Sequence, residues 1–352
     1  MTKILLDLLG ERNVAAVLIT SLPDIRWACG FSGSNGVLVV VPGQVHLITD
    51  GRYREQARNE VRGATVHTPG YALFGYAAQE GLLGDARRVL FQADHVTVAQ
   101  LDDWRTLWPG VEWLPCTGLL TLHVASKTPD EVDRLRRAQA VTDSVFERIL
   151  GWIRPGLREQ EVAAEIVYQH LQRGASGMSF DPIVASGPRG ALPHARPTNK
   201  RLAAGELVVL DFGCVVDGYA SDMTRTVALG EPGDEARKVY DVVLNAQQQA
   251  LEQARAGMKT TALDHVARAV IEEAGYGDFF SHSLGHGIGL QTHEWPRVSY
   301  HVDEVLPEGV AVTIEPGIYL PGRFGVRIED VVVLRGDGCD NLTGSPKTLV
   351  VL

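Results

Sequence analysis

The first part of the chain, up to about residue 122, alternates short apolar runs with longer segments in which apolar residues recur every three or four positions. Short apolar runs are typical of β-strands and the longer pattern is typical of amphipathic helices, so their alternation predicts an α/β domain. The clearest helix is expected at residues 96–108, and strands are expected at residues 14–20, 36–41, 45–49 and 88–92.

A new helix is expected to begin shortly after residue 126. Thr128 is the predicted N-cap, Pro129 the first helical residue and Glu131 the partner that completes a capping box. A chain of 352 residues also exceeds the size at which a single hydrophobic core usually divides. We therefore predict two domains, residues 1–125 and residues 126–352.

The second domain combines long helical patterns with strands that carry acidic residues. Helices are expected at residues 129–153, 158–174, 234–256 and 262–274. Strands are expected at residues 206–212, 221–228, 310–319 and 325–335. The strands are expected to pair as hairpins, which predicts an α+β domain with antiparallel strands.

Composition and charge narrow the possible partners. Apolar residues make up 45% of the chain, and the net charge is −10 with no run of lysine and arginine, which disfavours nucleic acid and anionic membranes as partners. A small-molecule or peptide partner fits better. Asp7, Glu11 and Arg12 interrupt the apolar stretch near the N-terminus, so neither a signal peptide nor a membrane-spanning helix is expected.

The cysteines show none of the paired spacings of zinc ribbons or redox motifs. They are expected to be ordinary buried thiols in a reducing, cytoplasmic location, and they are Cys29, Cys116, Cys214 and Cys339.

Two aspartates are predicted to meet on one hairpin. Asp217 and Gly218 lie between apolar runs, which is typical of a two-residue turn. A turn centred there places Asp211 opposite Thr224, with Asp222 as its diagonal neighbour on the same face. Two carboxylates held so close repel each other, so one must take up a proton or a cation must lie between them.

Further acids and histidines occur later in the second domain. Glu315 ends one apolar strand and Glu329 lies within another, and neither place suits a solvated acid. Residues 283–297 are rich in glycine, are interpreted as a loop and contain His286 and His293. The candidate ligands suit a pair of divalent cations with carboxylate bridging, and they are Asp211, Asp222, His286, Glu315 and Glu329.

Each of these acids also has a simpler interpretation. Asp222 alone could be a surface acid on a strand, and Glu329 alone could form a buried ion pair with Arg225 or Arg327. Asp330 follows Glu329 on the opposite strand face, so it is expected to be solvated or salt-bridged.

Two other histidines have simpler interpretations as well. His265 is expected to be structural or solvated. His282 is expected to serve packing or to contact a ligand from behind.

Five short motifs resemble the ordered signatures of the pita-bread metallopeptidases, the group that includes methionine aminopeptidase, aminopeptidase P and prolidase. They are LDFG at 210, SDMTRT at 221, LGHGIGLQTHE at 284, IEPGIY at 314 and VRIED at 326. The resemblance covers residues 127–352, and the preceding domain is similar to the creatinase-type N-terminal domain of aminopeptidase P and prolidase. It implies a pita-bread catalytic domain with a curved antiparallel sheet, and a homodimer.

The resemblance also implies roles for single residues. Asp211, Asp222 and Glu329 would bind one metal or bridge two, and His286 and Glu315 would complete the second metal's shell. Manganese, cobalt, zinc and iron all remain possible, because carboxylate-rich ligation tolerates each of them.

Catalytic and substrate-binding roles follow from the same resemblance. Glu315 would carry a proton from the nucleophile to the leaving amine, and His194 and His293 would steady the tetrahedral intermediate. Arg297 lies where prolidase-like members carry an arginine for the substrate's carboxylate, although it could instead form a surface salt bridge.

These expectations favour an Xaa-Pro dipeptidase acting on a dipeptide or short peptide. Aminopeptidase P activity is the closest alternative, and a pita-bread binding protein without catalysis is the alternative from another class.

Overall fold

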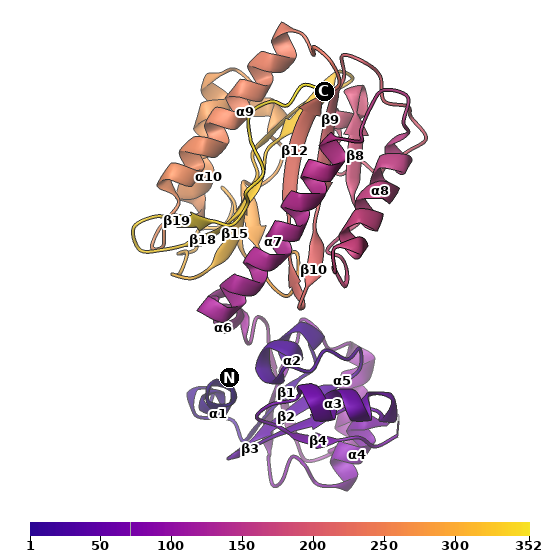
Figure 1. The fold of residues 1–352 in the computed structure, drawn as a ribbon. Coiled ribbons are helices and arrows are strands. Elements are labelled where there is room, and N and C mark those ends of the chain that lie inside the picture. Colours follow the sequence, from indigo (N-terminus) through magenta and orange to yellow (C-terminus); the bar gives the residue numbers. More distant parts are fainter. Residues whose placement is uncertain (71) are drawn as a thin grey trace. The chain divides into compact units, whose positions relative to one another are not determined.

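The computed structural model describes residues 1–70 and 72–352. The chain divides into two compact units, Met1–Val124 and Ala125–Leu352 (Figure 1). None of the helices in these described ranges is long and apolar enough to cross a bilayer. All four cysteines are free thiols; Cys29 and Cys214 are buried as expected, whereas Cys116 and Cys339 are half-buried.

The first unit is built on a six-stranded sheet in the order β4-β3-β2-β1-β5-β6. The strands are β1 (Ala16–Ile19), β2 (Val37–Val41), β3 (Gln44–Ile48), β4 (Thr65–His67), β5 (Arg88–Gln92) and β6 (Glu112–Cys116). β1, β2 and β3 pair antiparallel, while β4, β5 and β6 join the sheet in parallel pairs. The four strands expected from the apolar runs are therefore all present.

Helices accompany this sheet, as an α/β pattern predicts. They are α1 (Thr2–Glu11), α2 (Leu22–Cys29), α3 (Arg54–Glu60), α4 (Leu73–Gln79), α5 (Val98–Leu107), α6 (Thr121–Ala125) and the 3-10 turn η1 (Gly51–Tyr53). Trp104 of α5 is fully buried against Phe91 of β5 and Phe74 of α4. The helix predicted at 96–108 thus supplies an aromatic centre for this core.

The second unit begins its first long helix where the sequence predicts. Thr128 caps α7 (Pro129–Leu150), and its backbone and side chain form the capping box with Glu131. The other helices are α8 (Glu159–Gln172), α9 (Asp234–Gln253) and α10 (Thr260–Glu273), with 3-10 turns η2 (Gly187–Ala191) and η3 (Gly277–Phe279).

The strands of this unit form antiparallel ladders. Their orders are β12-β9-β8, β11-β10-β7, β14-β13-β15-β18-β19 and β16-β17. Their bounds are β7 (Gly177–Met178), β8 (Ile183–Ser186), β9 (Leu207–Phe212), β10 (Cys214–Val216), β11 (Tyr219–Ala220), β12 (Met223–Ala228), β13 (Gly285–Gly287), β14 (Glu294–Val298), β15 (Ala311–Ile314), β16 (Gly317–Leu320), β17 (Phe324–Arg327), β18 (Asp330–Leu334) and β19 (Cys339–Asn341).

Two pairs of helices cover these strands, and Figure 1 shows α7 beside α8 and α9 beside α10. Apolar side chains of α7 and α8 share a core with β9 and β12. Those of α9 and α10 share another core with β15 to β18. Each group of strands that carries candidate ligands is therefore packed against its own pair of helices.

Two of the predicted strands are wrong in one respect, because each is broken into two. The prediction at 310–319 becomes β15 and β16, and that at 325–335 becomes β17 and β18. The breaks fall at Glu315, whose N–H donates to Leu284 O (2.8 Å), and at Glu329, whose N–H donates to Thr224 O (3.1 Å). Each acid thus lies where the chain passes from one ladder to another.

The interpretation of residues 283–297 as a loop is wrong in part, because β13 and β14 occupy seven of these fifteen residues. A Cβ added to Gly285 would lie 2.0 Å from Thr313 O, and one added to Gly287 would lie 2.2 Å from Trp295 O. The glycines therefore permit strands to approach unusually closely instead of forming a loop.

Candidate active site

One cavity in the second unit brings together all eight site residues predicted from the sequence. Its volume is about 620 Å³. The five candidate metal ligands line it, together with His194, His293 and Arg297. Apolar side chains complete the wall, among them Phe180, Pro182, Ile183, Pro193 and Pro197.

The hairpin that carries the two aspartates has the predicted register. Asp217 and Gly218 form the turn with positive φ angles of 50° and 85°, and Thr224 of β12 pairs with Asp211 of β9. Asp211 and Asp222 are only 8% and 4% exposed, so the interpretation of Asp222 as a surface acid is wrong.

His286 faces the acids with its Nε2 atom. This nitrogen lies 3.3 Å from Glu315 Oε1 and 3.7 Å from Asp222 Oδ2. Nδ1 lies 3.1 Å from Gly287 O, so we assign the ring proton to Nδ1 and the lone pair to Nε2. Burial lowers the pKa of His286, which favours the neutral imidazole.

A tight group of ligand atoms surrounds this lone pair. One side-chain atom each from Asp222, His286 and Glu329 lies within 4.8 Å of the other two. Glu315 is oriented by Thr313, whose hydroxyl donates to Glu315 Oε1 (3.1 Å). Two of the groups are carboxylates and the third is a neutral nitrogen donor, so the space between them suits a cation.

The acids cannot all be ionised at neutral pH without added positive charge. Burial raises the pKa of Asp222 well above its usual range, and repulsion from Asp211 and Glu315 raises it further. Burial likewise raises the pKa of Glu329, with repulsion from Asp222 and Glu315. Burial also raises the pKa of Glu315, to about 7. These shifts follow from burying several carboxylates close together, and cations placed among them would lower each pKa again.

Arg327 supplies part of the positive charge. Its Nη2 donates to Asp211 Oδ2 (2.6 Å), its Nε to Thr224 Oγ1 (3.0 Å) and its Nη1 to the Tyr319 hydroxyl (2.7 Å). Asp211 Oδ1 is buried without a hydrogen-bond partner among the residues that the structure describes. The charge of one arginine cannot balance four carboxylates, and one carboxylate oxygen has no hydrogen-bond donor among these described residues. Both observations favour the binding of divalent metal ions.

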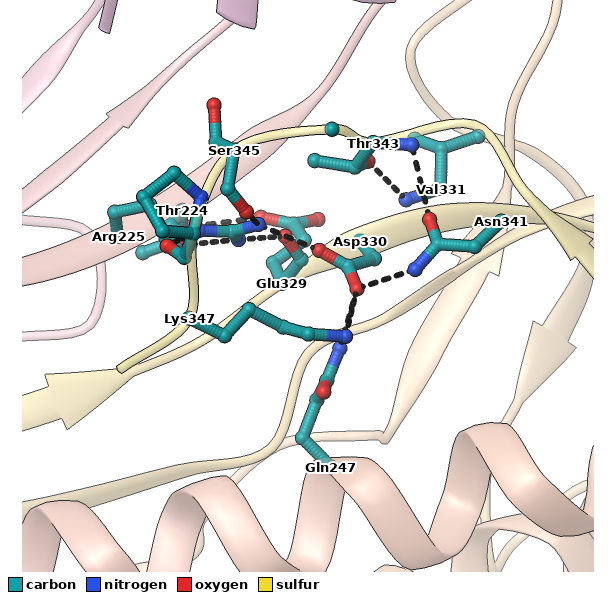
Figure 2. Close-up of polar contacts among 12 residues, drawn as sticks. Thr224, Arg225, Gln247, Glu329, Asp330, Val331, Asn341, Thr343, Ser345 and Lys347 are labelled. Atoms are coloured by element: carbon teal, nitrogen blue, oxygen red, sulfur yellow. Dashed lines mark hydrogen bonds and ion pairs between the residues drawn. The ribbon is translucent and has the colours of Figure 1, made fainter. Parts of the chain in front are cut away.

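The charge of Asp330, the residue after Glu329, is balanced by cationic side chains of the protein itself (Figure 2). Arg225 Nη2 donates to Asp330 Oδ1 (2.8 Å), and its Nη1 donates to Glu329 O (2.6 Å). Asp330 Oδ2 accepts from Gln247 (3.0 Å), Asn341 (2.7 Å) and Lys347 (2.6 Å). Asp330 is therefore salt-bridged and buried, so its solvated alternative is wrong.

These contacts also settle which acids the two arginines pair with. Arg225 pairs with Asp330 and Arg327 with Asp211, so the simpler interpretation of Glu329 as their ion-pair partner is wrong. Thr224 instead donates its hydroxyl to Glu329 Oε2 (2.6 Å).

The other three candidate residues, His194, His293 and Arg297, line the cavity with exposed side chains. The rings of His293 and His286 are 4.2 Å apart between centroids, and burial lowers the pKa of His293. His194 is exposed in the segment after η2. Arg297 of β14 donates from Nε to Ser283 Oγ (2.8 Å) and forms no ion pair within residues 1–70 and 72–352.

His282 belongs to a chain of contacts that the sequence did not reveal. Its Nε2 lies 2.9 Å from the Tyr319 hydroxyl, which in turn contacts Arg327. Burial lowers the pKa of His282 to about 3. Tyr319 was missed as a site residue, and its only signal was a polar group in the apolar strand that follows Glu315. His265 is exposed, as expected for a solvated histidine.

Comparison with known proteins agrees with this architecture. Residues 133–335 match Metallopeptidase family M24, and residues 2–122 match the Creatinase/Prolidase N-terminal domain. An uncharacterized peptidase of Bacillus subtilis (strain 168) is 37% identical over 346 residues, which cover 98% of each chain.

Two solved structures are similar over nearly the whole chain. An Xaa-Pro dipeptidase from Bacillus anthracis has a TM-score of 0.96 and 38% identity, covering 100% of this chain and 99% of that one. An X-Pro aminopeptidase from Thermotoga maritima MSB8 has a TM-score of 0.92 and 36% identity, covering 97% and 99%. The chain therefore belongs to metallopeptidase family M24, and it is a peptidase with an α/β creatinase-type N-terminal domain followed by an antiparallel α+β catalytic domain.

Proposed function

We propose that this protein is an Xaa-Pro dipeptidase that uses two divalent metal ions to hydrolyse the peptide bond before proline. The observation that carries the proposal is the group of four carboxylates around neutral His286, three of them buried and Glu315 half-buried, open to a cavity of about 620 Å³. The names of the similar B. anthracis and T. maritima proteins support a substrate with proline in the second position.

The donor set fits two such ions. Asp211, Asp222 and Glu329 would bind one ion or bridge both, and His286 and Glu315 would complete the second shell. Asp211 Oδ1 has no hydrogen-bond partner in the described residues, and His286 Nε2 carries the lone pair of the ring. These two atoms are therefore the best candidates to bind a cation. When bound, divalent ions lower the pKa of water and polarise a carbonyl group. Manganese, zinc, cobalt and iron all suit these donors.

Glu315 is the proposed proton carrier. Thr313 fixes Glu315 Oε1, so the carboxylate keeps one orientation in the cavity. It would take a proton from the attacking water and deliver it to the proline nitrogen, which must be protonated to leave. His194 and His293 line the same cavity and would donate hydrogen bonds to the oxygen of the tetrahedral intermediate.

Arg297 is the proposed reader of substrate length. Its Nε is held by Ser283, and its outer nitrogens are not engaged in an ion pair in the described part of the chain. A guanidinium can bind a free carboxylate through two parallel hydrogen bonds, which favours dipeptides over longer peptides. Aminopeptidase P activity remains the second candidate because the T. maritima structure is named an X-Pro aminopeptidase.

A two-substrate assay tests the proposal. The metal-free protein, reloaded with manganese, cobalt or zinc, is given an Xaa-Pro dipeptide and the matching Xaa-Pro-Yaa tripeptide. Faster dipeptide cleavage is expected, and faster tripeptide cleavage would support the aminopeptidase instead. No hydrolysis with any metal would favour the binding protein without catalysis. The homodimer and the cytoplasmic location stay predictions.

A further inference from the structure

A single buried carboxylate ties together both ends of the segment that carries His194. Glu159 is the first residue of α8 and has no exposed surface. Its Oε1 accepts from the N–H (2.9 Å) and the hydroxyl (3.0 Å) of Ser186. Its Oε2 accepts from the N–H (3.0 Å) and the hydroxyl (2.7 Å) of Thr198. Residues 187–197, which lie between these two anchors, are called the histidine loop below.

The loop contributes to its own attachment. Arg189 Nε donates to Glu159 Oε2 (2.9 Å), and its Nη2 donates to Arg196 O (2.6 Å). The backbone of α8 adds two bonds, from Glu159 N to Lys200 O (3.0 Å) and from Gln160 N to Thr198 O (3.1 Å). The Glu159 carboxylate is thus the point where five donors from both anchors and from the loop converge.

The histidine loop contacts β17, the strand that precedes Glu329. A Cβ added to Gly325 of β17 would lie 2.0 Å from Gly190 O, so the two backbones are in direct contact. Arg327 Nη1 donates to Pro193 O (3.2 Å), one residue before His194. The last five residues of the loop, 193–197, all line the cavity, whereas Glu159 does not.

We propose that Glu159 is a positioning residue that sets the place of His194 in the cavity. The chemical part of this inference rests on the proposed function, because it assumes that His194 acts on the substrate. Ser186 and Thr198 are twelve positions apart in the chain (198 minus 186). Holding both on one rigid carboxylate restricts the conformations of everything between them.

A carboxylate is required because both oxygens accept and neither donates. Glutamine has the same shape but only one acceptor oxygen, and its amide nitrogen carries two N–H donors. In Glu159→Gln the amide nitrogen would face the donors of either Ser186 or Thr198. One end of the histidine loop would then lose its anchor, while the rest of α8 stays unchanged.

The matched control is Glu161→Gln, which removes the same charge from the same helical turn. Glu161 is exposed and accepts from the Arg158 N–H (2.6 Å) instead of from the loop. Glu159→Gln is expected to lower kcat/KM for an Xaa-Pro dipeptide about 10–100-fold, mainly through kcat, as outer-shell partners of active-site groups do. Metal content per chain is expected to stay unchanged, and Glu161→Gln to stay within about 2-fold of wild type.

A double-mutant cycle separates positioning from general damage. In a His194→Ala background, Glu159→Gln is expected to lower kcat/KM by less than about 3-fold, because the group that it positions is gone. A full decrease in that background would overturn the inference. Thr198→Val removes one hydroxyl donor to Glu159 and is expected to lower kcat/KM by a smaller factor of about 3–10. If Glu159→Gln does not fold, Thr198→Val replaces it in every test.

Hydrogen exchange tests the attachment without any reaction. In Glu159→Gln the amides of residues 186–198 are expected to exchange at least about 10-fold faster than in wild type, with no change in Glu161→Gln. Unchanged exchange would overturn the inference. If the wild-type protein cleaves no Xaa-Pro peptide, the proposed function fails, and this measurement still decides whether Glu159 holds the histidine loop.

Discussion

Removing the charge of Asp330 should destabilise the second unit strongly and weaken metal binding at a distance. Asp330 is fully buried, and its partner Arg225 is 1% exposed (Figure 2). Asparagine keeps the shape but leaves the guanidinium as a buried cation without a countercharge. Breaking a buried pair in this way costs about 3–5 kcal/mol in the free energy of unfolding.

The other hydrogen-bond partners of Asp330 change this expected loss of stability little. The Lys347 side chain is 23% exposed, so its ammonium can turn to water, and its ion pair adds under about 1 kcal/mol. For a unit of this size, about 3–5 kcal/mol corresponds to a decrease in Tm of roughly 6–20 °C. Arg225 also holds Glu329 O, so a looser Arg225 should weaken metal affinity about 10–100-fold.

Denaturant unfolding of the metal-free proteins measures the first effect without the stabilisation that bound metal adds. Metal titration measures the second. The matched control is Asp303→Asn, because Asp303 pairs with Lys259 and their side chains are 53% and 57% exposed, so a change below about 1 kcal/mol is expected. An Asp330→Asn protein within about 1 kcal/mol of wild type, with unchanged metal affinity, would refute the reasoning.

Three further changes test other parts of the structure. Asp222→Asn is expected to reduce bound metal per chain and to lower dipeptide hydrolysis more than about 100-fold, which exceeds the loss caused by changing a residue that only contacts a metal ligand. Normal metal content by elemental analysis would contradict this. Arg297→Met is expected to raise KM for the dipeptide about 10–100-fold, from the ~1.5–3 kcal/mol of a charged hydrogen bond, and to leave a tripeptide nearly unchanged; equal effects on both would exclude carboxylate recognition. Burial lowers the pKa of His170 from 6.5 to about 4, so the unfolded chain binds the extra proton and stability falls as the pH falls from about 6.5 towards 4. The expected loss is about 2 kcal/mol between pH 7 and 5, and a His170→Gln protein with the same pH slope in urea unfolding would contradict it.

The hairpin of Asp211 and Asp222 could be predicted because local chemistry fixes it. A two-residue turn at Asp217 and Gly218 sets the register, and the alternation of side chains then sets which residues share a face. At Gly213 the two strands of the hairpin approach so closely that a Cβ would lie 1.9 Å from Ser221 O. Glycine has no Cβ, so the strands keep their register there. No contact with a distant part of the chain was needed for this inference.

The strands that were predicted wrongly depend instead on contacts between distant parts of the chain. The breaks at Glu315 and Glu329 depend on backbone bonds to Leu284 and Thr224, which are far away in sequence. An apolar run shows that a segment is buried, but it cannot show which ladder each half joins. The strands β13 and β14 escaped prediction for the same reason, because their glycines serve contacts with strands that the pattern alone does not identify.

Ion-pair partners were the least predictable feature. Alternation correctly placed Asp330 on the face opposite Glu329, but its partners are Arg225 on β12, Gln247 on α9 and Lys347 near the C-terminus. Whether an acid on a strand is solvated depends on what lies against that face, and these partners are 105, 83 and 17 positions away.

Glu329 and Asp330 show how two adjacent buried acids acquire opposite pKa shifts from their different partners. Both carboxyls are buried, and burial alone raises the pKa of each. For Asp330, Arg225 and Lys347 outweigh burial and hold the pKa below its usual range. Glu329 meets further acids instead, so its pKa is raised. Because adjacent residues share the same backbone, the difference comes from their partners. The face of Asp330 carries its own cations, whereas under the proposed function the cavity face is neutralised by metal ions from solution.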